Sequence, residues 1–288
     1  MKPILLGVSL MSALILSGCQ TADTSTDDST TSSLASNTSE TQSSSTEESS
    51  TSEQSSEVQS SMESSEQPSD KQEAFRYHIN PTTSVVEPID EAVDPKVALL
   101  TFDDSPDQHA VEIAEQLKAI NAPAIFFVNG MYIESDEGKE KLKQIYDMGF
   151  EIGNHTQTHP NLSTISPENQ REEILQTNQL IYEVTGEKPR FFRAPHGVTT
   201  ETSDAIMAEE DMVSMNWTYG YDWEADYQTS EALSGIMLNT EYLNNGANLL
   251  MHDRSWTNGA VISIAEGLIE KGFTLVDPNL IESPEREE

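Results

Sequence analysis

Short apolar runs alternate with amphipathic segments over about 180 residues of this chain, from position 96 to position 276. The runs are rich in β-branched and aromatic side chains, which is typical of buried strands. They lie at 96–102, 124–128, 150–153, 190–193, 212–217, 248–251 and 273–276. Helical patterns lie between them and are clearest at 109–120, 138–148 and 166–184. Gly149 and Gly186 are typical of helix ends, and Ser166-Pro167 is typical of a helix start.

This alternation of strands and helices predicts an α/β fold with parallel strands and helices on the outside. About seven strands fit a (β/α) barrel, which can be incomplete, better than an open sheet. In such barrels the functional side chains lie at the carboxyl ends of the strands. Five candidate side chains lie at or just past the end of an expected strand: Asp103, Asp104, His155, Arg193 and His252.

The first 18 residues have the pattern of a secretory signal peptide, with Lys2 before an apolar run over 4–15. This run is shorter than the roughly 18 apolar residues that a transmembrane helix needs. The tetrapeptide at 16–19, Leu-Ser-Gly-Cys, resembles a bacterial lipobox, which implies cleavage before Cys19 and lipid attachment to its sulfur. Cys19 is the only cysteine in the chain. We therefore expect a membrane anchor at Cys19 and an extracytoplasmic protein on the outer face of a bacterial cell membrane.

A segment with a very different composition follows, over residues 19–72. Residues 20–70 contain no Lys, Arg or aromatic residue and consist mostly of Ser, Thr, Glu, Asp and Gln. Such a segment buries too little apolar surface to offset the entropy of ordering, so we expect a disordered linker. The predicted organisation is therefore a signal peptide over 1–18, a lipidated cysteine with its linker over 19–72, and one folded catalytic domain over 73–288.

The charge of the chain narrows the range of partners. The formal net charge is −35, and the isoelectric point is about 4.2. Binding to phosphates needs a basic surface, so nucleic acid is not an expected partner. Nothing in the sequence indicates a protein partner.

Two histidines four residues apart and two adjacent aspartates predict a metal site. His155 and His159 with one carboxylate from Asp103-Asp104 give three ligands and open positions, which suits Zn²⁺ and also Mn²⁺, Co²⁺, Ni²⁺ or Fe²⁺. The second carboxylate is then available as a base toward water, whose pKa a bound metal ion lowers toward about 7. Two alternatives exist: the aspartates can belong to a turn and helix cap, and iron oxygenases use the same ligand types.

Five segments, in order, resemble the motifs of the polysaccharide deacetylases of carbohydrate esterase family 4, also called the NodB-homology domain. The similarity covers roughly 97–276, which is nearly the whole expected folded domain. The segments are Thr101-Phe102-Asp103-Asp104-Ser105 for T-F-D-D-G, His155-Thr156-Gln157-Thr158-His159 for H-[ST]-x-x-H, Arg193-Ala194-Pro195-His196 for R-x-P-Y, Asp222-Trp223 for the end of D-x-x-D-W, and Leu250-Met251-His252 for L-x-H.

The resemblance implies a distorted (β/α) barrel, one divalent metal ion and a role for each motif residue. It makes Asp103 the catalytic base and His252 the general acid, and it makes acetylated polysaccharide the substrate. The remaining implied roles are metal binding by Asp104, His155 and His159, positioning of Asp103 by Arg193, orientation of His252 by Asp222, a pocket for the acetyl methyl group from Trp223 and Leu250, and substrate binding at His196, whose backbone N–H would help to hold the oxyanion.

Three positions depart from the family pattern. Ser105 replaces a glycine, which indicates a turn that needs no positive φ at this position or tolerates the strain. Tyr219 replaces the first aspartate of the fourth motif, so polar contacts there are expected to differ. His196 replaces a tyrosine and keeps the backbone N–H, while its imidazole could contact substrate or a second ion.

The sequence thus favours hydrolysis of N-acetyl groups on an N-acetylhexosamine polysaccharide, with cell-wall peptidoglycan as the preferred substrate and Zn²⁺ as the preferred metal. One alternative is hydrolysis of O-acetyl esters on xylan-like polysaccharide. Another is a non-catalytic glycan-binding wall lipoprotein, which the altered third and fourth motifs motivate.

Overall fold

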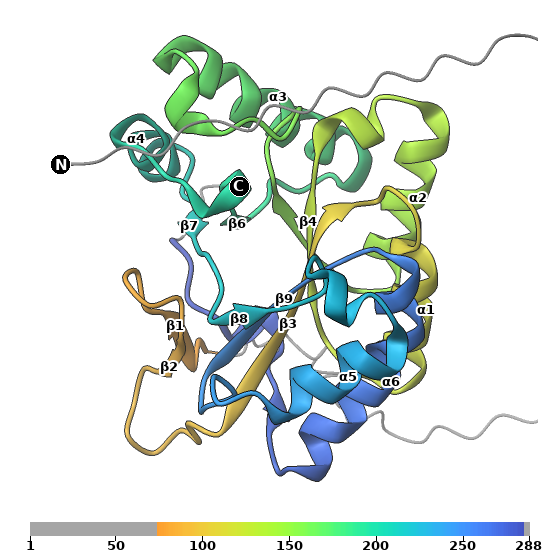
Figure 1. Cartoon of the computed structure of the whole chain (residues 1–288). Coiled ribbons are helices and arrows are strands. Elements are labelled where there is room, and N and C mark those ends of the chain that lie inside the picture. The colour runs from red at the N-terminus through yellow and green to blue at the C-terminus, as the bar shows by residue number, and fades with distance from the viewer. Residues whose placement is uncertain (1–73, 285–288) are drawn as a thin grey trace, which may run out of the picture. The chain divides into compact units, whose positions relative to one another are not determined.

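The computed structural model describes residues 74–284, in which a parallel sheet curls into an open barrel with helices on its outer side (Figure 1). The order of the strands is β7-β6-β5-β4-β3-β9-β8, and β10 pairs with β3. No pairing joins β7 to β8 within these residues, so the barrel is incomplete, as predicted. The strands are β3 (Val97–Ser105), β4 (Ile125–Val128), β5 (Glu151–Asn154), β6 (Phe191–Phe192), β7 (Val213–Ser214), β8 (Tyr219–Gly220), β9 (Ala247–His252) and β10 (Thr274–Leu275).

Six α-helices cover the outer side of the described barrel, and neighbouring helices pack in the order α4-α3-α2-α1-α6-α5. The start of α3 at Ser166 and its end at Gly186 agree with the sequence: the Ser166 side chain accepts from the Asn169 N–H, and Gly186 has a φ of 81°. The helices are α1 (Ala110–Ala119), α2 (Asp136–Asp147), α3 (Pro167–Thr185), α4 (Glu201–Glu209), α5 (Ser230–Asn239) and α6 (Ser255–Glu270).

The two-residue alternation of a strand decides which side chains face the barrel interior. On β3, Ala98, Leu100 and Phe102 pack in the cluster shared with the outer helices, whereas Leu99 belongs to the inner cluster. The same alternation continues to Asp103, which therefore lies on the inner side. On β9 it assigns Ala247, Leu249 and Met251 to the outer cluster and leaves Asn248, Leu250 and His252 on the inner side.

A short antiparallel hairpin, β1 (Tyr77–Ile79) and β2 (Val86–Pro88), lies beside the open seam of the barrel (Figure 1). In the turn of the hairpin, the Ser84 hydroxyl accepts a hydrogen bond from the Asn216 N–H at 2.9 Å. The Ser84 carbonyl accepts from the Asn248 side chain at 3.3 Å. These contacts connect the chain after β7 to β9 across the seam. Neither the hairpin nor β8 was among the predicted strands.

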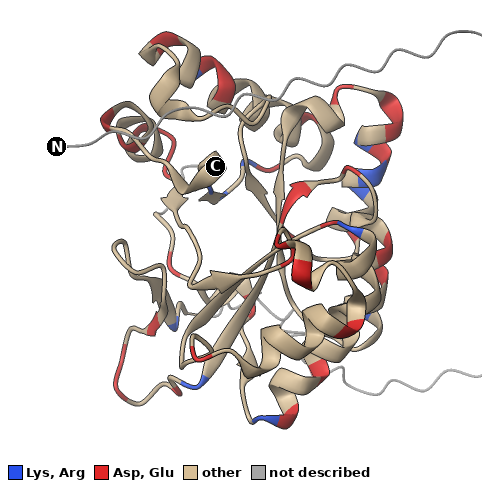
Figure 2. Ribbon diagram, in the orientation of Figure 1, with Lys and Arg blue, Asp and Glu red and all other residues tan. Residues whose placement is uncertain are grey.

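The predictions for the amino-terminal 73 residues lie outside the described part of the chain; they concern the signal peptide, Cys19 and the whole linker. Within residues 74–284, no helix has both the length and the apolar character that crossing a membrane requires. Acidic residues are spread over the outer helices, where basic residues are fewer (Figure 2).

Candidate metal and catalytic site

The predicted metal ligands lie together at the carboxyl end of the strands. Asp104 is near the end of β3, His155 directly follows β5, and His159 lies in the loop after it. One ligand atom from each residue lies within 4.8 Å of the others. The Oδ1 atom of Asp104 is 3.9 Å from Nε2 of His155 and 3.6 Å from Nε2 of His159. Ligands bound at about 2.0–2.1 Å to one tetrahedral ion lie about 3.4 Å apart, so these separations are close to those of a metal site.

The backbone at this site adopts an uncommon conformation. Asp104 has a φ of 58°, Thr156 of 68° and His159 of 59°. Left-handed conformations cost about 1–3 kcal/mol each for residues other than glycine, and they are concentrated at functional sites. Two of the three residues are predicted ligands, so the chain maintains backbone strain where the ligand atoms converge.

The hydrogen bonds of the histidines favour metal binding as well. Nδ1 of His155 lies 2.7 Å from the carbonyl oxygen of Arg193, which can only accept. Nδ1 therefore carries the proton, and the lone pair of Nε2 faces the cluster. Burial and the neighbouring His155 lower the pKa of His159, which also favours its neutral form. Two imidazoles and a carboxylate fit a divalent ion with an open coordination position.

Asp103 lies beside this cluster and forms a buried ion pair. Its Oδ1 accepts from Nη1 of Arg193 at 2.7 Å, and its Oδ2 is 3.6 Å from Nε2 of His155. Burial alone would raise the pKa of Asp103, but the charge and hydrogen bond of Arg193 outweigh burial and lower it. Asp103 is therefore ionised at neutral pH, as a proton acceptor must be.

Arg193 is completely buried and binds several groups besides Asp103. Its guanidinium donates to the Thr101 hydroxyl at 2.7 Å, to the Asn216 carbonyl at 2.8 Å and to the Asn248 side chain at 3.2 Å. It also lies over the ring of Phe127. A guanidinium with this many partners has little rotational freedom, so the orientation of Asp103 is fixed as well.

His252, the register partner of Asp103 on the neighbouring strand β9, is paired with Asp222. Nδ1 of His252 lies 2.8 Å from Oδ1 of Asp222. The Asp222 side chain is fully buried, and its Oδ2 accepts from the Thr257 hydroxyl. Burial alone would lower the pKa of His252, but the hydrogen bond and charge of Asp222 raise it to about 9. This leaves Nε2 as the nitrogen that can donate a proton to a bound molecule.

A cleft of about 310 Å³ connects these groups. Trp223 is 46% exposed, and its ring stands perpendicular to the His252 ring with the centroids 5.8 Å apart. Gly220 makes room for this packing, because a Cβ atom there would lie 2.7 Å from the Trp223 ring and 2.5 Å from the Leu250 carbonyl. The cleft is lined by Asp103, His155, His159, His196, Trp217, Trp223, Leu250 and His252.

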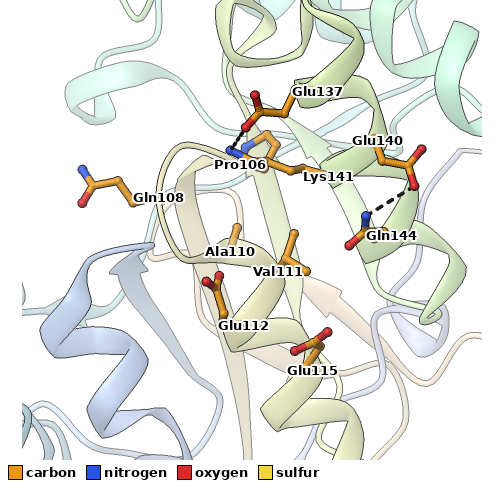
Figure 3. A pocket seen from close by; sticks show the side chains of 10 residues that line it. All are labelled: Pro106, Gln108, Ala110, Val111, Glu112, Glu115, Glu137, Glu140, Lys141 and Gln144. Carbon is orange, nitrogen blue, oxygen red and sulfur yellow. Dashed lines mark hydrogen bonds and ion pairs between the residues drawn. The ribbon is translucent and has the colours of Figure 1, made fainter. Parts of the chain in front are cut away.

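A larger groove, of about 450 Å³, lies on the outer side between α1 and α2 (Figure 3). Its lining contains Glu112, Glu115, Glu137 and Glu140, and Lys141 pairs with Glu137 at 3.2 Å. No histidine, cysteine or serine lines it. We therefore assign the chemistry of this protein to the smaller cleft.

The three departures from the family pattern have different structural results. Ser105 has no positive φ, which instead falls one residue earlier, on Asp104. Tyr219 is buried, and its hydroxyl donates to the Met237 carbonyl on α5 at 2.9 Å. The residue at this motif position therefore packs in the core instead of offering a carboxylate to the site. His196 is exposed, has a φ of 59°, and stands perpendicular to the His159 ring at 4.8 Å.

All predicted site residues in the described chain lie in or around this one site, and two others were missed. Trp217 lines the cleft, and Arg254 binds the second oxygen of Asp104 at 3.0 Å. Trp217 lies six residues before Trp223, and nothing in the sequence around it indicated that its side chain would line the cleft. The only sequence signal for Arg254 was a cation two residues after His252 at the start of an expected helix.

Several known proteins are similar to this chain in fold and in sequence. A match to the family Polysaccharide deacetylase extends over residues 90–214. A chitooligosaccharide deacetylase of Bradyrhizobium is 31% identical over 160 residues, which cover 54% of this chain and 69% of that protein. The solved structure of the Bc1960 peptidoglycan N-acetylglucosamine deacetylase, 27% identical, superimposes with a TM-score of 0.59 over 65% of this chain and 88% of that one. The chain belongs to the polysaccharide deacetylase family.

A peptidoglycan N-acetylglucosamine deacetylase of Bacillus cereus is 34% identical over 143 residues, or 46% of this chain. The matched region spans 50% of that relative's length.

We predict that His155→Ala abolishes stoichiometric binding of a divalent metal, because it removes a buried ligand whose tautomer is fixed by the main chain. The measurement is the zinc content of the full chain after stripping and reloading. His78→Ala, which alters a histidine paired with Glu87 on the hairpin, should keep the metal. An unchanged zinc content in His155→Ala would contradict the ligand assignment.

We also predict that Asp222→Asn lowers the pKa of His252 by roughly one to three units, since it removes the charge that offsets burial. His252 would then lose its proton well below pH 9 instead of near it. The measurement is an NMR titration of the His252 imidazole in metal-free protein. Asp226→Asn, at an exposed site in the same loop, serves as the control. Equal His252 pKa values in Asp222→Asn and the parent would show that Asp222 does not set this pKa.

Proposed function

We propose that this protein is a metal-dependent deacetylase that hydrolyses N-acetyl groups of an N-acetylhexosamine polysaccharide and releases acetate. The observation that carries the proposal is that Asp103 and His252 lie side by side in the same cleft. They are register partners on the adjacent strands β3 and β9 and line one cleft with His155 and His159. The lowered pKa of Asp103 favours its anion, and the raised pKa of His252 favours its cation. Asp103 can therefore accept a proton and His252 can donate one at neutral pH.

This pair of groups suits the cleavage of an amide. A nitrogen leaving group must be protonated as it departs, so the reaction needs a proton acceptor for the attacking water and a separate proton donor. Asp103 would accept the proton from water, and His252 would donate one to the departing nitrogen. A divalent ion held by Asp104, His155 and His159 would supply Lewis acidity toward water and the acetyl carbonyl. The backbone N–H of His196 would help to stabilise the oxyanion.

The lining of the cleft supports an acetylated sugar as the bound group. Trp223 and Leu250 offer apolar surface next to His252, which suits a methyl group. The exposed Trp223 and the neighbouring Trp217, with ring centroids 6.3 Å apart, offer aromatic faces to a sugar ring. Peptidoglycan is the preferred polymer, because relatives with that substrate in their names are similar in sequence and structure and because the proposed anchor would hold the protein at the wall.

The two alternative functions explain less of the site. Ester hydrolysis on xylan-like sugars releases an alcohol, which needs less help from an acid than an amine does. The buried Asp222 that raises the pKa of His252 therefore favours the amide. A glycan-binding protein would not need a strained ligand cluster, a buried base and a paired acid. Zn²⁺ is the preferred metal because the site combines two imidazoles with one carboxylate.

We further propose that the mature protein begins at Cys19 after removal of residues 1–18, carries lipid there, and reaches the wall through a linker over 19–72. A coil of that length spans on the order of 40 Å, enough to hold the domain away from a membrane surface. A lipid anchor of two or more acyl chains gives stable membrane attachment, whereas one chain is marginal.

The decisive experiment measures acetate released by the zinc-loaded full chain from peptidoglycan, chitin oligomers and acetylated xylan. We expect release from peptidoglycan and a loss of roughly 10²–10⁴-fold in rate for Asp103→Asn at unchanged zinc content, because only the base is removed. Asp147→Asn, on the exposed face of α2, is the matched control and should be fully active.

Three outcomes would contradict parts of this proposal. Full activity of Asp103→Asn would reject its role as base. Acetate from xylan alone would favour the ester reaction. No acetate from any polymer, despite bound zinc, would favour the glycan-binding protein.

For the anchor, we predict that Cys19→Ala releases the protein from the membrane fraction of an expressing bacterium, because the sulfur that would carry the lipid is gone. Fractionation with immunoblotting is the measurement, and Ser17→Ala is the control. If Cys19→Ala stays as membrane-bound as the parent, the anchor is not at this cysteine.

A further inference from the structure

The side chain of Arg254 lies between three carboxylates: Asp104 near the end of β3, Asp107 in the loop after β3, and Asp253 in the segment after β9. Its Nη2 donates to Oδ2 of Asp104 at 3.0 Å, and its Nη1 donates to Oδ2 of Asp107 at 3.0 Å. Nη1 also lies 3.7 Å from Oδ1 of Asp253. Arg254 comes two residues after His252, the last residue of β9, so the segment directly after the proposed acid also contacts the proposed metal ligand Asp104.

This contact gives the two oxygens of Asp104 different surroundings. Oδ2 is bound by Arg254, while Oδ1 faces Nε2 of His155 and Nε2 of His159. A carboxylate held in this way offers one oxygen to a metal ion, in a fixed direction. The backbone of Asp104 has a φ of 58°, a strained conformation for a residue other than glycine. The hydrogen bond from Arg254 helps to stabilise the Asp104 side chain in this conformation.

Arg254 is itself held by contacts that join its loop to the loop after β3. The Asp253 carboxylate accepts from the Gln108 N–H at 2.9 Å, and the Asp253 carbonyl accepts from the His109 N–H. Asp107 fixes the other side of the guanidinium. Since these acidic groups offset the charge of Arg254, its main effect on the metal centre is expected to be geometric.

We propose that Arg254 is a positioning residue for the metal centre, which holds Asp104 so that Oδ1 alone binds the ion. This inference rests on the proposed function, since it requires that the site holds a metal. Groups that bind a metal ligand from behind commonly contribute 10- to 100-fold to metal affinity or activity. The planar fork of arginine is suited to bridging two carboxylates, which lysine cannot reproduce.

An ordinary ion pair at a partly exposed position would behave differently. Such pairs contribute little to stability and nothing to metal affinity. The readout must therefore be the dissociation constant for zinc, measured on the metal-free full chain by competition with a chelator. Thermal unfolding of the same metal-free samples reports the purely structural effect separately.

We expect Arg254→Gln to raise the zinc dissociation constant by about 10- to 100-fold. Arg254→Lys should recover only part of this loss, because it restores the charge without the fork. Asp107→Asn should weaken zinc binding in the same direction but less. The double variant should bind zinc no more weakly than Arg254→Gln alone, because both changes disrupt the same contact.

Arg190→Gln is the matched control. Arg190 pairs with Glu151 at 2.8 Å at the amino ends of β5 and β6, far along the strands from the ligands. Its zinc dissociation constant should stay within about twofold of the parent, as expected for a distant and independent site.

An unchanged zinc dissociation constant in folded Arg254→Gln would overturn the inference, and so would full recovery by Arg254→Lys. If Arg254→Gln does not fold, Asp107→Asn decides, since unchanged zinc binding in that variant would also overturn it. Failure of the parent chain to bind zinc or any other divalent metal would instead reject the proposed function, so the two failures are distinguishable.

Discussion

The buried ion pair between Arg193 and Asp103 is the interaction on which the rest of the site depends. Removing two charges from water is costly, and the cost is offset only when every donor and acceptor has a partner. Arg193 meets this requirement through contacts with β3, β9 and the chain after β7. Its main-chain carbonyl also fixes the tautomer of His155. The hairpin turn at Ser84 supports the same arrangement through Asn216 and Asn248.

The architecture followed from the sequence because its signals are local. Apolar runs gave the long strands, and the two-residue alternation on β3 and β9 explains why Asp103 and His252 share an inner face. The incomplete barrel and the polysaccharide deacetylase family were both predicted. The strand β8 and the hairpin were missed because they do not lie in apolar runs: β8 is one tyrosine and a glycine, and the hairpin strands have His78 and Glu87 in their middle positions. Trp217 and Arg254 were missed because their roles depend on contacts between segments far apart in the sequence.

The replaced motif residues indicate which parts of the site tolerate change. Tyr219, which stands where the family motif has an aspartate, makes a core contact with α5. The pairing of Asp222 with His252 is present all the same. His196 keeps a left-handed backbone conformation despite its new side chain, so the main chain at this position keeps its conformation even though the residue differs. The groups that would carry protons or a metal thus keep their partners, whereas the substituted Ser105 and Tyr219 are buried in the fold and His196 is exposed beside His159.

Arg193 contacts the site through both its side chain and its main chain, and this has a consequence for how metal binding and turnover would depend on each other. Its guanidinium orients Asp103, the proposed base, and its main-chain carbonyl fixes the tautomer of His155, a proposed metal ligand; substitution removes only the first of these groups. Substitution at position 193 would leave that carbonyl in place, but it would also leave the buried Asp103 carboxylate without its cation, which is costly. Only a replacement that tolerates this buried charge could separate the proposed metal binding from the proposed turnover.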